Sequence, residues 1–585
     1  MIVSDGKTFS YEDQLPRVPL PTLEETCARF LEWCAPLLTD AELASTEAAV
    51  EQFLAPDSTA RSLHAALEEF DGTEGVRSWL DLFWPTRYLG RRDRIALNAN
   101  FFFLFRDVEE TQEQRAAALI SAAVAYKVRL DAEAIPPVVL RGEPQSMVQN
   151  KFLFSATRIP HEQQDTARTT FPSDARHVVV FFRGNAFRMD VVGPDGVPHD
   201  LGDLTGGLQA IMKADRAEFS AGPLTTKARA AWAHSREALL VDNAAALETI
   251  ETALFCVALE DFAPADTLAA CDQLLHGDSA NRWFDKAVTF VVFADGRAGI
   301  NVEHCELDGT TILAFTDAML SVPTEEHLRV SGAAAQGLPA TEPVEFVLSE
   351  ELCEDSVAAA ASFAQYGADT ATVTLSFEDF GKRRAKELKI SPDAFVQMAY
   401  QLAHQRSKGL QGATYESIGT RQFQNGRTEA MRVVTPEAIA FVSTVEDASS
   451  SRADRRAAFR AAADAHVRRA KECQAGSAPE QHLWELQLIH KRRGGTEPLP
   501  LYDTPGWTIM RDDYLSTSSA PSEHIQYFGF GSTSAKCIGV AYVLLPDRFN
   551  LYLSTPRPVA EEMHRFATYL GEAITELQDL LATED

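Results

Sequence analysis

Apolar residues recur every three to four positions in several long stretches of the chain, the spacing that lines one face of an α-helix. This pattern predicts helices within residues 20–55, 238–260, 391–406, 453–472 and 559–582. Ser391 and Pro392 mark the start of one of them, because serine caps helix N-termini and proline fits the first turn.

Other apolar stretches are short, or alternate with polar residues, and end at turn residues, which is the pattern of β-strands. Residues 177–196 predict a hairpin that turns at Gly184 and Asn185. Residues 281–309 predict two strands joined by an Asp295–Gly296 turn, with His304 at the end of the second strand. Further strands are expected near 371–376, 525–530, 537–545 and 550–554.

With 585 residues, the chain is too long for one ordinary hydrophobic core. Residues 330–344 are small and turn-rich, so we place the main domain boundary there. Strands and helices occur on both sides of it. This predicts two α/β domains, 1–341 with His304 and 342–585, and a site between them.

Charge and cysteine usage narrow the functional classes. The net charge of −30 argues against binding to nucleic acid or anionic membranes, but leaves room for a local basic patch that binds a phosphorylated cofactor. No apolar run reaches the roughly 18 to 20 residues of a membrane span, and neither terminus resembles a targeting signal. The eight cysteines form no CxxC pair, which favours free thiols. We expect a cytoplasmic protein without a metal site.

His304 is a candidate general base, because it ends a predicted strand and a neutral imidazole can accept a proton near pH 7. Taken alone, one histidine among fourteen is more often structural than catalytic. The neighbouring Cys305 would point to the opposite face of the strand, which disfavours it as a nucleophile. The motifs GxGxxG, GxxxxGK[ST], GxSxG and HExxH do not occur in the sequence, and several common enzyme classes become less plausible for that reason.

Four segments carry recognisable motifs: EHCELDG at 303–309, FGKRRAKELKISPDAF at 380–395, TYESIGTRQFQNGRTEAMR at 414–432 and YLSTSS at 514–519. Together they resemble motifs of the carnitine/choline acyltransferase family, and the likeness extends along the whole chain in the family's order. The resemblance implies a fold like that of chloramphenicol acetyltransferase, with two similar domains. Each domain would hold a mixed β-sheet flanked by helices, with an active-site tunnel at the domain interface.

The resemblance also implies a mechanism. His304 would take the proton of an acceptor hydroxyl, and the oxygen would attack the thioester of acyl-CoA directly, without an acyl-enzyme. Asp308 and Arg427 match a pair that holds the histidine loop in the family. Ser518 matches the hydroxyl that stabilises the oxyanion. Acyl-CoA would be a co-substrate, and no permanently bound cofactor is expected.

Lys382 and Lys386 match the family's lysines for the 3′-phosphate of CoA, and Asp393 opens the helix that follows. They lie in a local positive segment of an otherwise acidic chain, as a phosphate site requires. Without the resemblance, a solvated helix face would be the simpler interpretation of this segment.

The acceptor residues give a mixed signature. Tyr415 and Thr428 match residues that hold the carboxylate of carnitine, and choline-using members replace that threonine with an apolar residue. Gln481 stands where carnitine-using members have an arginine, and choline-using members have a neutral asparagine there. Ser516 matches a residue near the acceptor. Phe528 matches an aromatic residue near the ammonium group, although it could equally belong to the core.

The sequence therefore predicts an acyl-CoA-dependent O-acyltransferase that acts on a small hydroxyl compound such as carnitine. Gln526 falls where the family limits acyl length, and a polar residue there indicates a short or functionalised acyl group. One alternative is a specialised member that acylates a non-carnitine hydroxyl, such as a choline-like compound, a polyol or a natural-product alcohol. Another is a member that takes its acyl group from an acyl carrier protein.

Overall fold

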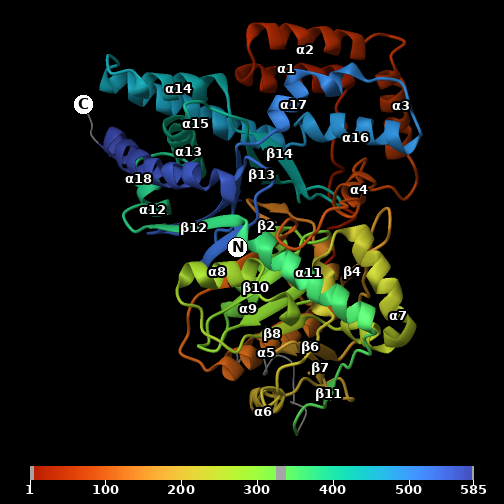
Figure 1. The fold of residues 1–585 in the computed structure, drawn as a ribbon. Coiled ribbons are helices and arrows are strands. Elements are labelled where there is room, and N and C mark those ends of the chain that lie inside the picture. The colour runs from red at the N-terminus through yellow and green to blue at the C-terminus, as the bar shows by residue number, and fades with distance from the viewer. Residues whose placement is uncertain (1–5, 324–336, 583–585) are drawn as a thin grey trace. The chain divides into compact units, whose positions relative to one another are not determined.

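The computed structural model describes residues 6–323 and 337–582. The described residues group into two compact units (Figure 1). Unit 1 falls within Met1–Asp13, Trp84–Thr374 and Ala520–Gly531, and unit 2 within Gln14–Phe83, Leu375–Ser519 and Ser532–Asp585.

The chain passes between the two units at 374/375, and also at 13/14, 83/84, 519/520 and 531/532. The sequence pattern instead suggests one boundary at 341/342. That boundary rests on the turn-rich segment 330–344, and residues 330–336 of this segment lie outside the described residues. The division into domains 1–341 and 342–585 stays a prediction.

Unit 1 contains an eight-stranded mixed sheet in the order β11-β7-β6-β8-β9-β10-β1-β16. The strands β6, β8 and β9 pair in parallel, and every other neighbouring pair in this sheet is antiparallel. Their bounds are Asn100–Phe105 (β1), His177–Phe182 (β6), Asn185–Asp190 (β7), Cys256–Leu259 (β8), Val288–Val292 (β9), Ala298–Glu303 (β10), Thr341–Pro343 (β11) and Ile525–Phe530 (β16). There are also two small two-stranded sheets. One pairs β2 (Val139–Leu140) with β3 (Glu143–Pro144), and the other pairs β4 (Thr157–Ile159) with β5 (Thr166–Arg168).

The helices of unit 1 cover this sheet. The alanine-rich α5 begins at a Thr111 capping box, contacts β9 and α9, and is buried along most of its length. The helix bounds are Gln112–Asp131 (α5), Leu201–Ile211 (α6), Arg229–Thr252 (α7), Thr267–Leu275 (α8), Gly309–Leu320 (α9) and Glu350–Ala368 (α11). The short α4 (Phe83–Tyr88) begins at the last residue of one unit-2 segment.

Unit 2 contains a six-stranded mixed sheet in the order β12-β18-β17-β15-β13-β14. Here β13, β15 and β17 pair in parallel, with antiparallel β14 and β18 outside them. The bounds are Thr370–Phe377 (β12), Thr414–Gly419 (β13), Thr428–Arg432 (β14), Leu515–Ser519 (β15), Ile538–Leu544 (β17) and Phe549–Pro556 (β18), and the division at 374/375 falls within β12.

The two sheets repeat one strand plan. In unit 1 the order β7-β6-β8-β9-β10 has two parallel pairings flanked by antiparallel ones, and β14-β13-β15-β17-β18 in unit 2 has the same pattern. In each sheet, a strand from earlier in the chain lies next to the last strand of this pattern. It is β1 beside β10 in unit 1, and β12 beside β18 in unit 2. Two similar mixed sheets flanked by helices confirm the predicted α/β class. The predicted tunnel between domains stays a prediction.

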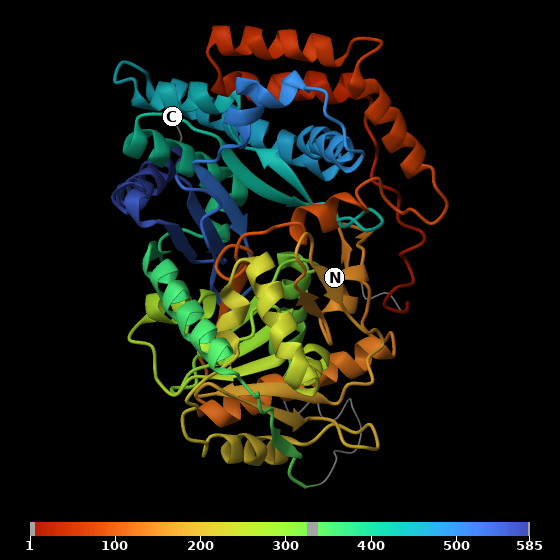
Figure 2. The ribbon, with the colours of Figure 1, turned by 45° about the vertical axis from the view of Figure 1, so that its right-hand side comes forward.

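The helices of unit 2 form two groups. In one, α13 packs along α18, and α14 along α15. In the other, the N-terminal α1 and α2 pack on α17, and α3 packs on α16, so red helices lie against lighter blue ones (Figures 1 and 2). The bounds are Leu23–Cys34 (α1), Asp40–Phe53 (α2), Thr59–Asp71 (α3), Lys382–Glu387 (α12), Pro392–Lys408 (α13), Pro436–Glu446 (α14), Arg452–Gln474 (α15), Glu480–Arg492 (α16), Pro505–Arg511 (α17) and Ala560–Ala582 (α18).

Most predicted elements are confirmed, including the α13 start, where the Ser391 side chain accepts a hydrogen bond from Ala394 N–H. The prediction of one helix over 238–260 is wrong at its end. There α7 stops at Thr252, and the following apolar run forms the fully buried strand β8. A short apolar run fits a buried strand as well as a helix, so periodicity could not decide between them. The hairpin turns at Arg183 and Gly184, one residue earlier than predicted, and both have positive φ.

Within residues 6–323 and 337–582, no helix is both long and apolar enough to cross a membrane. The eight cysteines are free thiols, and seven of them are buried.

Candidate active site

His304 follows the last residue of β10 in unit 1, and its side chain is 31% exposed. Its Nδ1 donates a hydrogen bond to the Leu307 carbonyl oxygen at 2.7 Å. A carbonyl oxygen can only accept, so the proton of the neutral imidazole is on Nδ1. The lone pair of the neutral ring is therefore on Nε2, which makes that atom the proton acceptor.

The loop after His304 is held by Gln149, a residue that the sequence patterns do not single out. Gln149 Nε2 donates to Asp308 Oδ2 at 2.6 Å. Gln149 Oε1 accepts hydrogen bonds from Asp308 N–H at 2.9 Å and from the Thr311 hydroxyl at 2.8 Å. Asp308 is the residue directly before α9, and its Oδ1 lies 3.6 Å from His304 Nδ1. The carboxylate thus lies beside the imidazole.

Arg158 supports the same loop from another direction. This fully buried guanidinium donates to Glu303 Oε1 at 3.0 Å, to Asp165 Oδ2 at 2.6 Å and to the Tyr88 carbonyl at 2.8 Å. Burial alone would lower the pKa of Arg158, but the carboxylates of Glu303 and Asp165 raise it above its usual value. Glu303 Oε2 in turn accepts a hydrogen bond from Cys305 N–H at 3.1 Å.

Cys305 itself is buried, and burial raises the pKa of its thiol well above the usual value. Because a thiol attacks as the thiolate, this supports the interpretation of Cys305 as a structural residue rather than a nucleophile.

Aromatic rings surround the imidazole in unit 1. The Tyr88 ring lies 5.1 Å from the His304 ring, and the Phe101 ring meets it edge-on at 5.3 Å. Phe528 on β16 packs edge-on against Phe101 and Phe103, and is only 6% exposed. Phe528 therefore belongs to the aromatic cluster that adjoins His304. Its predicted contact with a substrate ammonium stays a prediction.

Gln526 lies two residues before Phe528 on the same strand. Its Nε2 donates to the Phe105 carbonyl at 2.8 Å and to Asp107 Oδ1 at 3.1 Å. These contacts lie at a register shift between β1 and β16. Its role in limiting acyl length stays a prediction.

In unit 2, several predicted residues share one face of the sheet. Thr517 Oγ1 accepts a hydrogen bond from Gln397 of α13, so Thr517 faces that helix. Strand side chains alternate, which places Ser516 and Ser518 on the opposite face. Tyr415 pairs with Ser516 in register and therefore lies on the same face as the two serines. We call this the Tyr415 face.

The neighbouring strand β14 adds Thr428 and Arg432 to the Tyr415 face, because Gly419 pairs with Thr428 and Tyr415 with Arg432. The Arg432 guanidinium lies 5.7 Å from the Tyr415 ring centre. Burial would lower the pKa of Arg432, but the carboxylates of Asp513 and Glu480, which it contacts at 2.5 Å and 2.6 Å, raise it.

Gln481 is the second residue of α16 and is 1% exposed. Its Nε2 donates to the Thr428 carbonyl at 2.7 Å, which fixes the orientation of the amide. Its Oε1 is buried and has no hydrogen-bond partner. Gln481 is thus joined to the strand that carries Thr428, and its place at the arginine position of carnitine-using members stays a prediction.

Arg427 precedes Thr428 and is 7% exposed, and its carbonyl accepts a hydrogen bond from Thr420 N–H at 3.0 Å. Asp308 belongs to unit 1 and Arg427 to unit 2. The ion pair between them stays a prediction.

The predicted CoA residues lie on α12 and α13. Lys382 and Lys386 are four residues apart on α12, so they share one side of the helix. The N–H groups of Lys382 and Arg383 donate to the carbonyls of Leu545 and Pro546, both at 2.8 Å, which ties α12 to the loop between β17 and β18. Asp393 lies in the first turn of α13, where its Oδ1 accepts a hydrogen bond from the Tyr542 hydroxyl at 3.3 Å.

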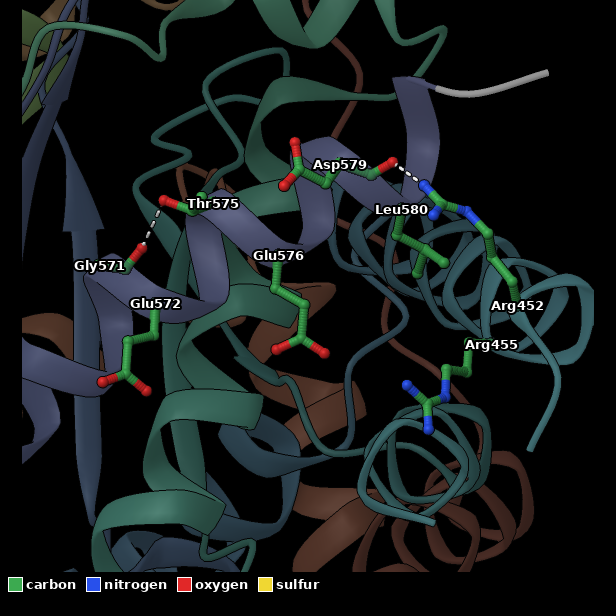
Figure 3. Close-up of a pocket in the computed structure, with 8 residues that line it drawn as sticks. All are labelled: Arg452, Arg455, Gly571, Glu572, Thr575, Glu576, Asp579 and Leu580. Atoms are coloured by element: carbon green, nitrogen blue, oxygen red, sulfur yellow. Dashed lines mark hydrogen bonds between the residues drawn. The ribbon is translucent and has the colours of Figure 1, made fainter. Parts of the chain in front are cut away.

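A separate cavity of about 760 Å³ lies between α15 and α18 in unit 2 (Figure 3). Arg452 donates to the Asp579 carbonyl, Arg455 donates to the Asp447 carbonyl, and Glu576 accepts a hydrogen bond from Arg406. Of the described residues that line the cavity, none is a predicted site residue. Arg452, Arg455 and Glu576 thus each make a hydrogen bond within the chain.

The sequence profile of the family described as Choline/Carnitine o-acyltransferase matches residues 18–572. Carnitine O-palmitoyltransferase 2, mitochondrial, of Rattus norvegicus is 30% identical over 92% of this chain and 88% of its own length. Carnitine O-acetyltransferase of Homo sapiens is 29% identical over 99% of this chain and 96% of its own. Peroxisomal carnitine O-octanoyltransferase of Rattus norvegicus is 31% identical over 86% of this chain and 85% of its own. One of these relatives is named as mitochondrial and another as peroxisomal. The cytoplasmic location expected for this chain therefore stays a prediction.

Proposed function

Because the chain belongs to the choline/carnitine O-acyltransferase family and is therefore an O-acyltransferase, we propose that it moves an acyl group between CoA and a small hydroxyl acceptor such as carnitine. His304 is the general base of this reaction. The observation that carries the proposal is the hydrogen bond from His304 Nδ1 to the Leu307 carbonyl, which leaves Nε2 as the basic nitrogen.

In the forward direction, His304 Nε2 takes the proton of the acceptor hydroxyl as the hydroxyl oxygen attacks the thioester carbonyl. The new C–O bond forms and the carbonyl π electrons move onto its oxygen, which the Ser518 hydroxyl stabilises by donating a hydrogen bond. As the tetrahedral intermediate collapses, the C–S bond breaks. The departing thiolate then receives the proton from His304. No covalent intermediate with the enzyme is required.

Asp308 supports this cycle electrostatically. While His304 holds the transferred proton the ring is positively charged, and a carboxylate 3.6 Å from Nδ1 favours that charged form. The Leu307 carbonyl keeps the ring in place and cannot itself take up the Nδ1 proton, so the proton that moves is the one on Nε2.

The CoA end of the site rests on Lys382 and Lys386. Their shared side of α12 offers two ammonium groups to a phosphate, in a chain whose net charge of −30 otherwise repels anions. This supports acyl-CoA as the co-substrate.

A second candidate is transfer to a hydroxyl compound other than carnitine. It is favoured by Gln481, whose neutral amide is bound to the Thr428 carbonyl. A carboxylate at this place would meet the uncharged Oε1 of the amide instead of a guanidinium, and it would lose a charge-assisted hydrogen bond worth about 1.5–3 kcal/mol. Thr428 and Tyr415 on the Tyr415 face favour carnitine, whereas Gln481 favours another acceptor.

The test is CoA release from acetyl-CoA to octanoyl-CoA over a panel of acceptors that includes carnitine, choline, other amino alcohols and polyols. We expect hydroxyl-dependent release of CoA with at least one acceptor. Release with a non-carnitine alcohol at a higher kcat/KM than with carnitine selects the second candidate. No acceptor-dependent release with any acyl-CoA contradicts both.

A further inference from the structure

One peptide group connects Gln149 to the proposed base. The carbonyl of the Leu307–Asp308 peptide accepts the hydrogen bond of His304 Nδ1 at 2.7 Å, and the N–H of the same peptide donates to Gln149 Oε1 at 2.9 Å. A peptide group is planar and rigid, so the orientation of its N–H fixes that of its carbonyl. Gln149 therefore sets the direction of the group that holds the imidazole.

The same side chain also holds the carboxylate beside the imidazole. Gln149 Nε2 donates to Asp308 Oδ2 at 2.6 Å, while the other oxygen, Oδ1, lies 3.6 Å from His304 Nδ1. Gln149 is 5% exposed and lies in the short helical turn Val148–Phe152. Both polar atoms of its amide are used, since Oε1 also accepts a hydrogen bond from the Thr311 hydroxyl at 2.8 Å.

We infer that Gln149 is a positioning residue for the acyl transfer, and this inference rests on the proposed role of His304 as the base. It acts through two groups at once: the Leu307 carbonyl, which fixes the ring and its tautomer, and the Asp308 carboxylate, which stabilises the protonated ring. Only an uncharged side chain with both a donor and an acceptor can make these contacts. Alanine offers neither, and an ionised glutamate sets a second carboxylate against Asp308.

Gln149→Ala tests this. We expect kcat to fall about 10- to 100-fold, because the imidazole loses its fixed orientation. The KM values for acyl-CoA and acceptor should stay within about twofold, because Gln149 is placed to act on the base and not on either substrate. Thr311→Val is the matched control. It removes only the contact of Gln149 with α9, so kcat should stay within about threefold.

A double-mutant cycle separates positioning from general structural damage. In the His304→Ala background, Gln149→Ala should change the residual rate less than about twofold, because the residue through which it acts is gone. An undiminished effect in that background, an unchanged kcat in the single variant, or a KM increase of the same size overturns the inference. If His304→Ala alone keeps full activity, the proposed function fails first, which is a distinguishable result.

Gln149→Glu provides a second variant of nearly the same shape if the alanine variant unfolds. When the introduced carboxyl group is protonated it can still donate to Asp308 Oδ2, whereas its ionised form repels that carboxylate. The other ionisable groups involved are Asp308, the adjacent His304 and, where the proposed pair forms, Arg427. We expect the kcat deficit of this variant relative to the parent chain to shrink at least about threefold between pH 8 and pH 6. A deficit that does not change with pH contradicts the inference.

Discussion

The hydrogen bond from His304 Nδ1 to a backbone carbonyl distinguishes the two nitrogens of one imidazole. A carboxylate in the place of this carbonyl could exchange a proton with the ring, whereas a carbonyl can only accept the hydrogen bond. Asp308 is close enough to stabilise a charged ring but, at 3.6 Å, is too far for an ordinary hydrogen bond. Orientation and charge stabilisation are thus provided by two different groups.

At the acceptor end, we predict that Gln481→Arg raises kcat/KM for carnitine. A guanidinium has enough donors to keep the contact with the Thr428 carbonyl and still offer a charged pair to a carboxylate. The expected gain is about 10- to 100-fold, which corresponds to the roughly 1.5–3 kcal/mol of a charge-assisted hydrogen bond. Steady-state assays with carnitine and choline measure it. Gln487→Arg, on the same helix, is the control, and an unchanged preference in Gln481→Arg shows that this position does not face the acceptor.

At the scale of elements, the placement of α12 leads to a prediction about the CoA phosphate. If Lys382 and Lys386 bind the 3′-phosphate, the double alanine variant should have a KM for acyl-CoA about tenfold or more above that of the parent chain. It should also fail to distinguish acyl-CoA from its 3′-dephospho form, whereas the parent chain prefers the phosphorylated one. Lys389→Ala, just after α12, is the control. A double variant that keeps this preference would rule out the assignment.

Helix α16 also carries a buried imidazole that makes the stability of unit 2 sensitive to acid. His482 lies between Thr26 Oγ1 at 2.7 Å and His64 Nδ1 at 3.0 Å, and burial lowers the pKa of His482 to about 3. An unfolded chain has the ordinary histidine pKa of about 6.5. The unfolded state therefore binds more protons below about pH 6.5, and the contribution of this residue to stability is lost as the pH falls from about 6.5 toward 3.

We predict that His482→Gln reduces this acid sensitivity. Urea unfolding at pH 7 and pH 5 should show the stability difference between the parent and the variant shrinking by up to about 2 kcal/mol at the lower pH. His490→Gln, at the other end of α16, should leave the pH dependence unchanged. A His482→Gln variant with the same pH dependence as the parent would show that His482 does not lose its proton on folding.

The strands that the sequence predicts and those that it misses differ in their surroundings. The β10 strand follows a clear Asp-Gly turn signal, so its place before His304 could be predicted. The buried β8 has only four residues, all apolar, and its pattern fits the end of a helix equally well. The strand β16 is predictable at its actual residues, but its partner β1 lies more than four hundred residues earlier. No local pattern indicates such a pairing.

For the whole molecule, the repeated strand plan gives two sheets of one pattern that carry different candidate side chains. In unit 1, the residue after β10 is the proposed base. In unit 2, the strands β13, β14 and β15 carry Tyr415, Thr428 and the two serines on one face. Similar sheets can present different side chains because the fold fixes backbone positions and leaves the exposed positions of each strand free to vary.

The motifs made most of the candidate site predictable, but not what holds it together. His304 and Asp308 are four residues apart, so a short sequence pattern reveals both. Gln149 lies 159 residues before Asp308 and carries no motif, and its role follows only from three-dimensional contacts. The same holds for Arg158, which is 145 residues from Glu303. Sequence reasoning thus missed Gln149 and Arg158, the buried side chains that hold the residues around His304.

The most direct test of the account is the turnover of His304→Ala at saturating acyl-CoA and acceptor, measured as CoA release, together with its affinity for acyl-CoA. A general base contributes roughly 10²- to 10⁴-fold, so the account predicts a loss of at least about a hundredfold. Acyl-CoA affinity should remain within about twofold, because the proposed CoA contacts lie on α12 and α13. Near-parental turnover in His304→Ala would contradict the account.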